Sequence, residues 1–245
     1  MSAQQDVPPQ SAVILPTLWS GPWIWREQRA VFAAAAPNVL EIEDAVVNWP
    51  IDGTLDAAEA HCLAMMADLP APMVLAGASL GGLLALRLGL HRPDLVSRVI
   101  ACGCPGLGAN DELGRGLGGR FTLTFDEAKA ARAALFQDPS RVSDEELRAT
   151  VAAVANRQGV RRGARLVRAL RRYDVSADLL QLTVPTTLIW GEADQLAPLA
   201  PWLPLVEACA SLHLRVIADT GHVPMLESPR AFNEILSEIL PARGR

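Results

Sequence analysis

Residues 73–90 read MVLAGASLGGLLALRLGL, the pattern of a buried strand followed by a tight turn and a helix. The first four residues are apolar, as expected of a strand covered on both faces, and the leucines and alanines from residue 80 onward favour a helix. The turn, GASLG, matches G-x-S-x-G, in which the serine has a strained backbone and flanking side chains would collide with it. This pattern predicts that Ser79 is presented at a sharp strand-to-helix turn, although a glycine-rich turn with an ordinary surface serine has the same pattern.

The composition limits the classes of protein that this chain can represent. With 245 residues, 50% of them hydrophobic, it can bury the core of one large domain that carries an inserted subdomain. A net charge of −5 argues against a nucleic-acid surface. We find no signal-peptide pattern, no apolar run of transmembrane length, and no cysteine or histidine spacing typical of a disulfide framework or a metal site. The expectation is a cytoplasmic protein without metal or other cofactor, which binds neither nucleic acid nor membrane and whose oligomeric state is open.

Candidate strands and helices alternate along most of the chain. Apolar runs predict strands at residues 12–15, 39–42, 73–76, 96–101, 186–190 and 212–217. Helical patterns occupy residues 25–36, 56–69, 80–91, 199–209 and 229–240. Between residues 105 and 180 the alternation stops, and the helical patterns there cover residues 126–136, 144–157 and 164–173. The sequence therefore predicts an α/β protein whose doubly wound, mostly parallel sheet is formed by residues 1–104 and 181–245, with a helical insertion at residues 105–180 after the fourth strand.

Two loops that follow predicted strands carry groups that can activate Ser79. Asp194 follows the strand at residues 186–190, and His222 follows the strand at residues 212–217. Ligand sites of open α/β sheets lie at the carboxyl ends of the strands, so both loops are expected beside the turn of Ser79. A serine hydroxyl needs an imidazole to accept its proton, and the imidazole needs a carboxylate that holds its tautomer. We therefore predict a catalytic triad of Ser79, His222 and Asp194.

Each of these residues also has a plainer interpretation. His222 is compatible with a capping or surface histidine, and Asp194 with an ordinary turn aspartate. Glu192 and Asp219 are rival carboxylates. Glu192 lies too close to the end of its strand, and Asp219 too close to His222 in the sequence, to reach the imidazole easily. The sequence therefore favours Asp194 as the partner of His222.

The chain resembles the α/β-hydrolase superfamily from about residue 12 to residue 240. The resemblance rests on GASLGG at residues 77–82, HRPDLV at 91–96, LIWGEAD at 188–194 and TGHVPMLESPRAFN at 220–233. It implies the α/β-hydrolase fold, with Ser79 as the nucleophile, His222 as the general base and Asp194 as its acid. It also implies that residues 105–180 are a helical cap. ALFQDP at residues 134–139 and VSDEEL at 142–147 are loosely similar to the cap of hydrolases that cleave C–C bonds of aromatic ring-cleavage products.

The loop after the first predicted strand departs from the pattern of that superfamily. Its members carry His-Gly there, whereas this chain has Pro16 and Thr17. The resemblance implies that the N–H groups of Leu18 and Leu80 form the oxyanion hole, the donor pair that stabilises a developing oxyanion. Pro16 has no N–H group and Thr17 restricts the backbone, and the loss of one donor costs about 2.7–4 kcal/mol in the transition state. We therefore expect the Leu18 N–H to be aimed less well than the Leu80 N–H.

Tryptophans and arginines give further candidates for contact with a ligand. Trp19 and Trp49 are predicted to line an apolar substrate cavity, with packing of their loops as the alternative. Trp23 and Trp25 match packing positions of the superfamily. Six arginines between residues 161 and 172 predict a solvated face of the insertion, with one of them reaching a substrate carboxylate or phosphate as the alternative.

Three classes of function are compatible with these motifs: hydrolysis, non-hydrolytic catalysis and ligand binding. The leading prediction is a cofactor-independent serine hydrolase of an ester, a lactone or a thioester, whose partner is a small apolar substrate. The altered residues Pro16 and Thr17 keep open a lyase or cyclase of a biosynthetic pathway on the same scaffold, and the cap keeps open a C–C bond hydrolase. A receptor that only binds its ligand is the third function, and the intact triad disfavours it.

Overall fold

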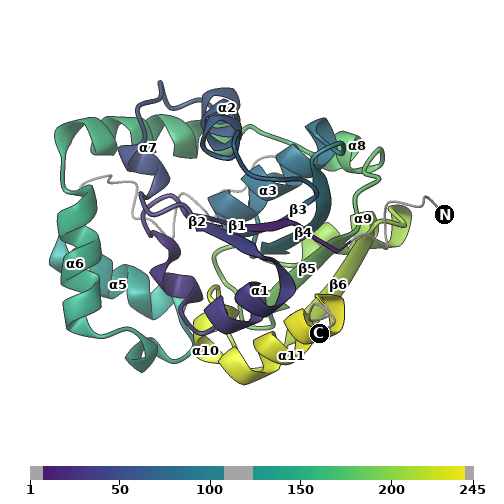
Figure 1. The fold of residues 1–245 in the computed structure, drawn as a ribbon. Helices are drawn as coiled ribbons and strands as arrows, with labels where there is room; N and C mark the ends of the chain where they lie inside the picture. Colours follow the sequence, from purple (N-terminus) through teal and green to yellow (C-terminus); the bar gives the residue numbers. More distant parts are fainter. Residues whose placement is uncertain (1–7, 108–123, 241–245) are drawn as a thin grey trace.

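Six parallel strands form one sheet in the computed structural model, which describes residues 8–107 and 124–240 (Figure 1). The strands are β1 (Ser11–Leu15), β2 (Asn38–Glu41), β3 (Met73–Ala78), β4 (Val96–Cys102), β5 (Thr186–Gly191) and β6 (Leu212–Ile217). Their order is β2-β1-β3-β4-β5-β6, and every neighbouring pair in these ranges is parallel. The predicted parallel sheet is confirmed, and each strand lies within two residues of its predicted position.

Alternating side chains divide the interior of the protein into two cores, one on each face of the sheet. Val13 and Leu75 lie in the first core, whereas Ala12 and Val74 lie in the second. The helices over the first core are α2 (Leu55–Met65), α3 (Leu80–His91), α8 (Ser176–Leu179) and α9 (Leu203–Ala208). Those over the second are α1 (Arg29–Ala35), α10 (Pro224–Glu227) and α11 (Pro229–Ile239) (Figure 1). Cover on both faces is what an all-parallel sheet requires, since both of its sides are apolar.

Three further helices lie between β4 and β5 in the chain and are called the insertion helices. They are α5 (Phe125–Leu135), α6 (Asp144–Val154) and α7 (Arg157–Leu170). They form a layer beyond one end of the sheet, on the left in Figure 1. Capping boxes begin α5 at Thr124 and α6 at Ser143, where each side chain accepts the N–H of a glutamate three residues later. The boundaries of a separate cap at residues 105 and 180 stay a prediction, because residues 108–123 lie outside the described ranges.

The structure corrects the predicted bounds of several helices. The helix predicted at residues 56–69 ends at Met65, and residues 199–209 contain a 3-10 helix followed by α9. The helix predicted at residues 25–36 is a 3-10 helix, η1 (Pro22–Trp25), followed by α1, and the Trp25 ring between them packs edge-on against Phe32 and Phe232. The helix predicted at residues 164–173 begins earlier, because the side chain of Asn156 caps α7 by accepting the N–H of Gly159. The other 3-10 helices in the described ranges are η2 (Val46–Asn48), η3 (Pro139–Arg141) and η4 (Ala200–Trp202).

A buried ion pair fastens α3, the helix that follows Ser79, to α2. Arg87 of α3 donates from Nε to Glu59 of α2 over 2.6 Å, and both side chains are less than 10% exposed. Arg87 also donates to Asp56 at 2.6 Å, but the Asp56 side chain is 89% exposed. His91 contacts the second oxygen of Glu59, and the ring of Tyr173 lies 5.1 Å from the Arg87 guanidinium. Glu59 therefore neutralises a charge that α3 carries into the interior.

We predict that Glu59→Gln lowers the free energy of unfolding by about 3 kcal/mol, because it leaves the buried charge of Arg87 without its partner. Asp56→Asn, which removes an exposed carboxylate from the same arginine, should cost less than about 1 kcal/mol. Urea unfolding of both variants measures the two free energies of unfolding, and the dependence of each on urea concentration is compared with that of the wild type. Equal losses in the two variants would contradict this assignment.

Candidate active site

Ser79 lies at the turn that joins β3 to α3, at the carboxyl end of the sheet. Its φ of 51° is in the half of the backbone map that is strained for a residue with a Cβ atom. The Ser79 N–H donates to the carbonyl of Cys102, the last residue of β4, over 2.8 Å. Ser79 is half-buried. The turn expected from the sequence is therefore sharp, and Ser79 is the residue that bears its strain.

Close approach of backbone segments explains the glycines around Ser79. A Cβ atom at Gly77 would overlap the carbonyl group of Gly81. A Cβ atom at Gly81 would lie 2.5 Å from the carbonyl oxygen of Pro16. Only glycine allows contacts this close without a shift of the main chain. The start of α3 therefore lies directly against the loop of Pro16 and Thr17.

Asp194 and His222 come together in the loops after β5 and β6. His222 Nδ1 and Asp194 Oδ2 are 2.8 Å apart, and both side chains are buried. The other oxygen of Asp194 accepts the N–H groups of Leu196 and Ala197, each at 2.9 Å. These two bonds orient the carboxylate, and its remaining oxygen then orients the imidazole.

The rival carboxylates do not reach the imidazole of His222. Glu192 and Asp219 are exposed, while Asp194 is buried against the ring. Asp219 has a φ of 54°, so it shapes the turn before His222. The partner of His222 is therefore the carboxylate that the sequence favoured.

The second nitrogen of His222 is left available. His222 Nε2 is buried and has no hydrogen-bond partner in the described residues. The ring lies against Gly103, where a Cβ atom would be 2.9 Å from His222 Nδ1 and 3.1 Å from Asp194 Oδ2. Gly103 follows Cys102, which binds the Ser79 N–H, so the imidazole and the serine flank the same short segment. His222 Nε2 makes no hydrogen bond with Ser79 Oγ in the structure, and a nitrogen without a partner is free to accept a proton.

Gly103 is a site residue that the sequence interpretation missed. Its φ is 51° and its missing side chain makes room for the imidazole, so two separate constraints require glycine. The signal in the sequence is the position of this glycine directly after a predicted strand, in the Cys-Gly-Cys sequence at residues 102–104.

The loop after β1 leaves its expected oxyanion donor free. Within residues 8–107 and 124–240, the N–H groups of Leu18 and Leu80 donate to no protein acceptor. Thr17 replaces the usual glycine without a positive φ, and its hydroxyl accepts the N–H of Ser20 at 2.8 Å and that of Trp19 at 3.3 Å. Thr17 thus stabilises this loop through its own side chain. The aim of the Leu18 N–H at an oxyanion stays a prediction.

The two tryptophans predicted to line a cavity have different surroundings. Trp49 is buried, donates its Nε1–H to the carbonyl of Asp44 at 2.9 Å, and stacks at 4.8 Å on the ring of His61. These are packing contacts. Trp19 is only partly buried and lies beside Gly163 of α7. Contact with a substrate stays a prediction for both, and the position of Trp19 fits it better.

Two arginines of α7 hold this helix on the loop after β2. Arg162 donates from Nε to the carbonyl of Ile51 at 2.9 Å and from Nη1 to the carbonyl of Val47. Arg165 donates to the carbonyl of Asp52 at 3.0 Å. Other arginines of the predicted cluster are exposed, and these are Arg161, Arg168, Arg171 and Arg172. A contact of this cluster with a substrate stays a prediction.

The thiols on either side of Gly103 are poor rivals to Ser79 as nucleophiles. Burial raises the pKa of Cys102 and of Cys104, and the charge of nearby Asp194 raises the pKa of Cys104 further. A thiol with a raised pKa stays protonated at neutral pH, and the protonated form is unreactive.

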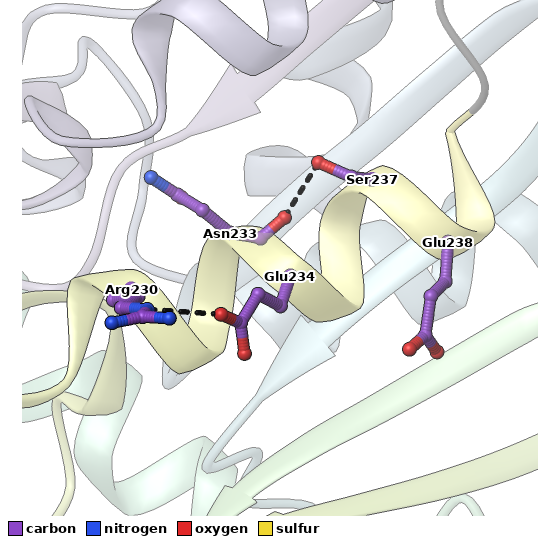
Figure 2. Close-up of a pocket in the computed structure, with 5 residues that line it drawn as sticks. All are labelled: Arg230, Asn233, Glu234, Ser237 and Glu238. Atoms are coloured by element: carbon purple, nitrogen blue, oxygen red, sulfur yellow. Dashed lines mark hydrogen bonds and ion pairs between the residues drawn. The ribbon is translucent and has the colours of Figure 1, made fainter.

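Two other observations concern the rest of the described residues. Figure 2 shows a surface depression on α11, lined by Arg230, Asn233, Glu234, Ser237 and Glu238. Arg230 pairs with Glu234 within α11, Asn233 donates to the carbonyl of Glu27, and Glu238 pairs with Arg215 of β6. The depression contains none of the predicted site residues. Within residues 8–107 and 124–240, no cluster of histidine, cysteine and acidic side chains is suited to a metal ion, and no helix is long and apolar enough to cross a membrane.

The sequence of this chain is similar to a family of known proteins and to individual enzymes. The sequence model of the alpha/beta hydrolase family matches residues 12–235. A pimeloyl-(acyl-carrier protein) methyl ester esterase of Aeromonas salmonicida is 30% identical over 180 residues, which make up 69% of this chain and 70% of that protein. A 2-hydroxy-6-oxo-6-phenylhexa-2,4-dienoate hydrolase of Burkholderia cepacia is 30% identical over 177 residues, or 68% of this chain and 62% of that protein.

A solved structure shares the architecture of this chain. The meta-cleavage product hydrolase CumD of Pseudomonas fluorescens IP01 superimposes with a TM-score of 0.77 at 21% identity, covering 95% of this chain and 91% of that chain. At this level of identity, the likeness shows the fold alone.

We predict that Gly103→Ala lowers the rate of hydrolysis of a p-nitrophenyl ester by about tenfold to 100-fold, because the new methyl group displaces the imidazole of His222. Gly53→Ala is the matched control, since Gly53 also has a positive φ, of 91°, but lies against Arg165 of α7. Steady-state rates of folded protein, checked by thermal unfolding, measure the effect. A similar loss of rate in both variants would indicate strain alone and contradict a direct effect on His222.

Proposed function

Because this chain belongs to the alpha/beta hydrolase family and has its fold, we propose that it is a cofactor-independent serine hydrolase with a triad of Ser79, His222 and Asp194. We propose that it acts on an ester, a lactone or a thioester with an apolar acyl part. The observation that carries the proposal is the His222–Asp194 pair. His222 Nδ1 lies 2.8 Å from Asp194 Oδ2, and the buried His222 Nε2 has no hydrogen-bond partner in the described residues. An imidazole in this state is prepared to act as a base.

The first half of the reaction forms an acyl-enzyme. Ser79 Oγ attacks the carbonyl carbon of the substrate while His222 Nε2 takes its proton, and Asp194 stabilises the resulting imidazolium. The N–H groups of Leu80 and Leu18 receive the oxyanion of the tetrahedral intermediate. His222 then returns the proton to the leaving alcohol or thiol as the C–O or C–S bond breaks.

The second half releases the acid. A water molecule attacks the acyl carbon while His222 Nε2 takes one of its protons. The new tetrahedral intermediate collapses, the bond to Ser79 Oγ breaks, and His222 returns the proton to the serine. No cofactor enters either half, because acyl transfer to water needs only a nucleophile, a base and an oxyanion hole.

An apolar acyl part fits the surroundings of this triad. We propose that the insertion helices act as a cap over the carboxyl ends of the strands, and that Trp19, which lies beside α7, lines the cavity beneath. Aromatic and apolar walls with few polar groups are usual for sites that bury small ligands. A cytoplasmic location completes the proposal.

A C–C bond hydrolase is the second candidate function. One observation favours it: the 30% identical relative of Burkholderia cepacia is named a 2-hydroxy-6-oxo-6-phenylhexa-2,4-dienoate hydrolase. The methyl ester esterase of Aeromonas salmonicida is also 30% identical to this chain, and its name supports an ester as the substrate. Parallel assays with p-nitrophenyl esters and with a vinylogous 1,5-diketone ring-cleavage product separate the two functions.

We predict that a fluorophosphonate probe adds once to the wild-type chain and that Ser79→Ala abolishes the adduct, because Ser79 is the proposed nucleophile at the turn between β3 and α3. Ser20→Ala, which removes a serine from the nearby loop after β1, should leave labelling unchanged. Intact-mass spectrometry measures the adduct. An adduct that persists in Ser79→Ala would place the nucleophile elsewhere.

We also predict that Asp194→Asn lowers kcat/KM for ester hydrolysis by about 10³-fold to 10⁴-fold, because the amide favours the wrong tautomer of His222. Glu192→Gln changes an exposed carboxylate of the same loop and should alter the rate less than about twofold. Steady-state kinetics of both variants make the comparison. Equal losses of kcat/KM in the two variants would show that the rate depends on the charge of the loop and not on the hydrogen bond between Asp194 and His222.

A further inference from the structure

We propose that Glu227 is a positioning residue, which holds the loop of His222 in place and lets the insertion control where the general base lies. The proposal rests on the proposed function, in which His222 accepts the proton of Ser79. Glu227 is the last residue of α10, which begins two residues after His222, and it is buried. A buried carboxylate outside the triad needs a physical explanation, because burying a charge without partners is costly.

Both carboxylate oxygens of Glu227 accept hydrogen bonds from backbone N–H groups. Oε1 accepts from Gly221, the residue before His222, at 2.8 Å. Oε2 accepts from Gln137 at 2.7 Å and from Asp138 at 3.0 Å, in the turn that follows α5. Hydrogen bonds to a charged acceptor are roughly twice as strong as neutral ones. One side chain therefore joins the loop of His222 to the insertion by three such bonds.

Direct contacts between main chains reinforce this connection. The His222 N–H donates to the carbonyl of Leu135, the last residue of α5, at 2.7 Å. A Cβ atom at Gly221 would lie 2.6 Å from the same carbonyl oxygen and 3.0 Å from the nitrogen of Gln137. On its other side, the Gly221 carbonyl occupies the place that a Cβ atom of Gly191 in β5 would need. The loop of His222 lies between sheet and insertion with no free space on either side.

Glu227 and Asp194 act on different parts of His222. Asp194 binds the ring at Nδ1 and so sets its tautomer and orientation. Glu227 binds the main chain next to His222 and so sets the position from which the ring projects. A catalytic group displaced by about 1 Å can lose about 100-fold in rate. A movement of residues 135–138 is transmitted to the base through Glu227 and through the bond from His222 N–H to Leu135.

The substitution Glu227→Gln breaks the connection with little change of volume. An amide has one acceptor oxygen, whereas Glu227 accepts N–H groups on both of its oxygens. The amide oxygen can serve either Gly221 or the pair Gln137 and Asp138, and the amide NH₂ group then faces an N–H donor at the other end. The ring of His222 keeps its bond to Asp194.

The experiment compares the wild type, Glu227→Gln and Glu234→Gln. Glu234 is an exposed glutamate of α11 that pairs with Arg230, and it serves as the matched control. Two readouts are taken on folded protein, the rate at which a fluorophosphonate labels Ser79 and the downfield proton signal of His222 Nδ1–H. We expect Glu227→Gln to slow labelling between about tenfold and 100-fold and to shift or broaden the signal, and Glu234→Gln to change neither.

The other outcomes would contradict either the positioning role of Glu227 or the proposed function. Unchanged labelling of folded Glu227→Gln, or slower labelling with an unchanged signal, would leave Glu227 with a structural role only, even if the thermal midpoint falls. A wild type that is not labelled at Ser79 would refute the proposed function, and the proton signal would still decide the role of Glu227. If Glu227→Gln does not fold, Glu227→Asp replaces it with the same expectation, since it keeps the charge but is one methylene too short to span both ends.

Discussion

At the turn between β3 and α3, the main chain of Gly77 packs against that of Gly81, and Gly81 packs against the carbonyl of Pro16. The strained backbone of Ser79 persists because these contacts leave it no other conformation. The turn lies at the carboxyl end of β3, which is an inner strand of a parallel sheet that is covered on both faces. The same packing places the N–H of Leu80 at the start of α3, close to the serine that it is proposed to serve.

His222, the proposed general base, comes from another part of the fold. His222 belongs to the loop after β6, its ring is held by Asp194 from the loop after β5, and Gly103 after β4 leaves room for the imidazole. Three neighbouring strands therefore contribute to one pair of side chains at their carboxyl ends. The main chain of this loop bonds to the insertion at Leu135, and Glu227 adds a second link. The insertion is therefore bonded directly to the loop that carries His222.

The strands and most helices could be predicted because the local sequence pattern of each one indicates where it begins and ends. The helix at residues 80–91 and the strand at residues 212–217 have the predicted bounds, since their apolar patterns start and stop at glycine, proline or polar residues. α7 begins at Arg157, before the predicted start at residue 164, and this stretch contains Gly159 and Gly163, which disfavour a helix. In the structure Gly159 completes the cap of Asn156, and Gly163 lets the helix approach Val47. Tertiary contact there outweighs helix propensity.

The sequence alone predicted the positions of Ser79, Asp194 and His222 in strand-end loops, because a strained turn and the loops after strands have recognisable residue types and spacing. The tertiary structure alone decided that Asp194 binds the imidazole, that Gly103 makes room for it, and that Glu227 holds its loop. These roles depend on hydrogen bonds and contacts between segments far apart in the chain. Such contacts exist only once the sheet and the insertion have brought the segments together.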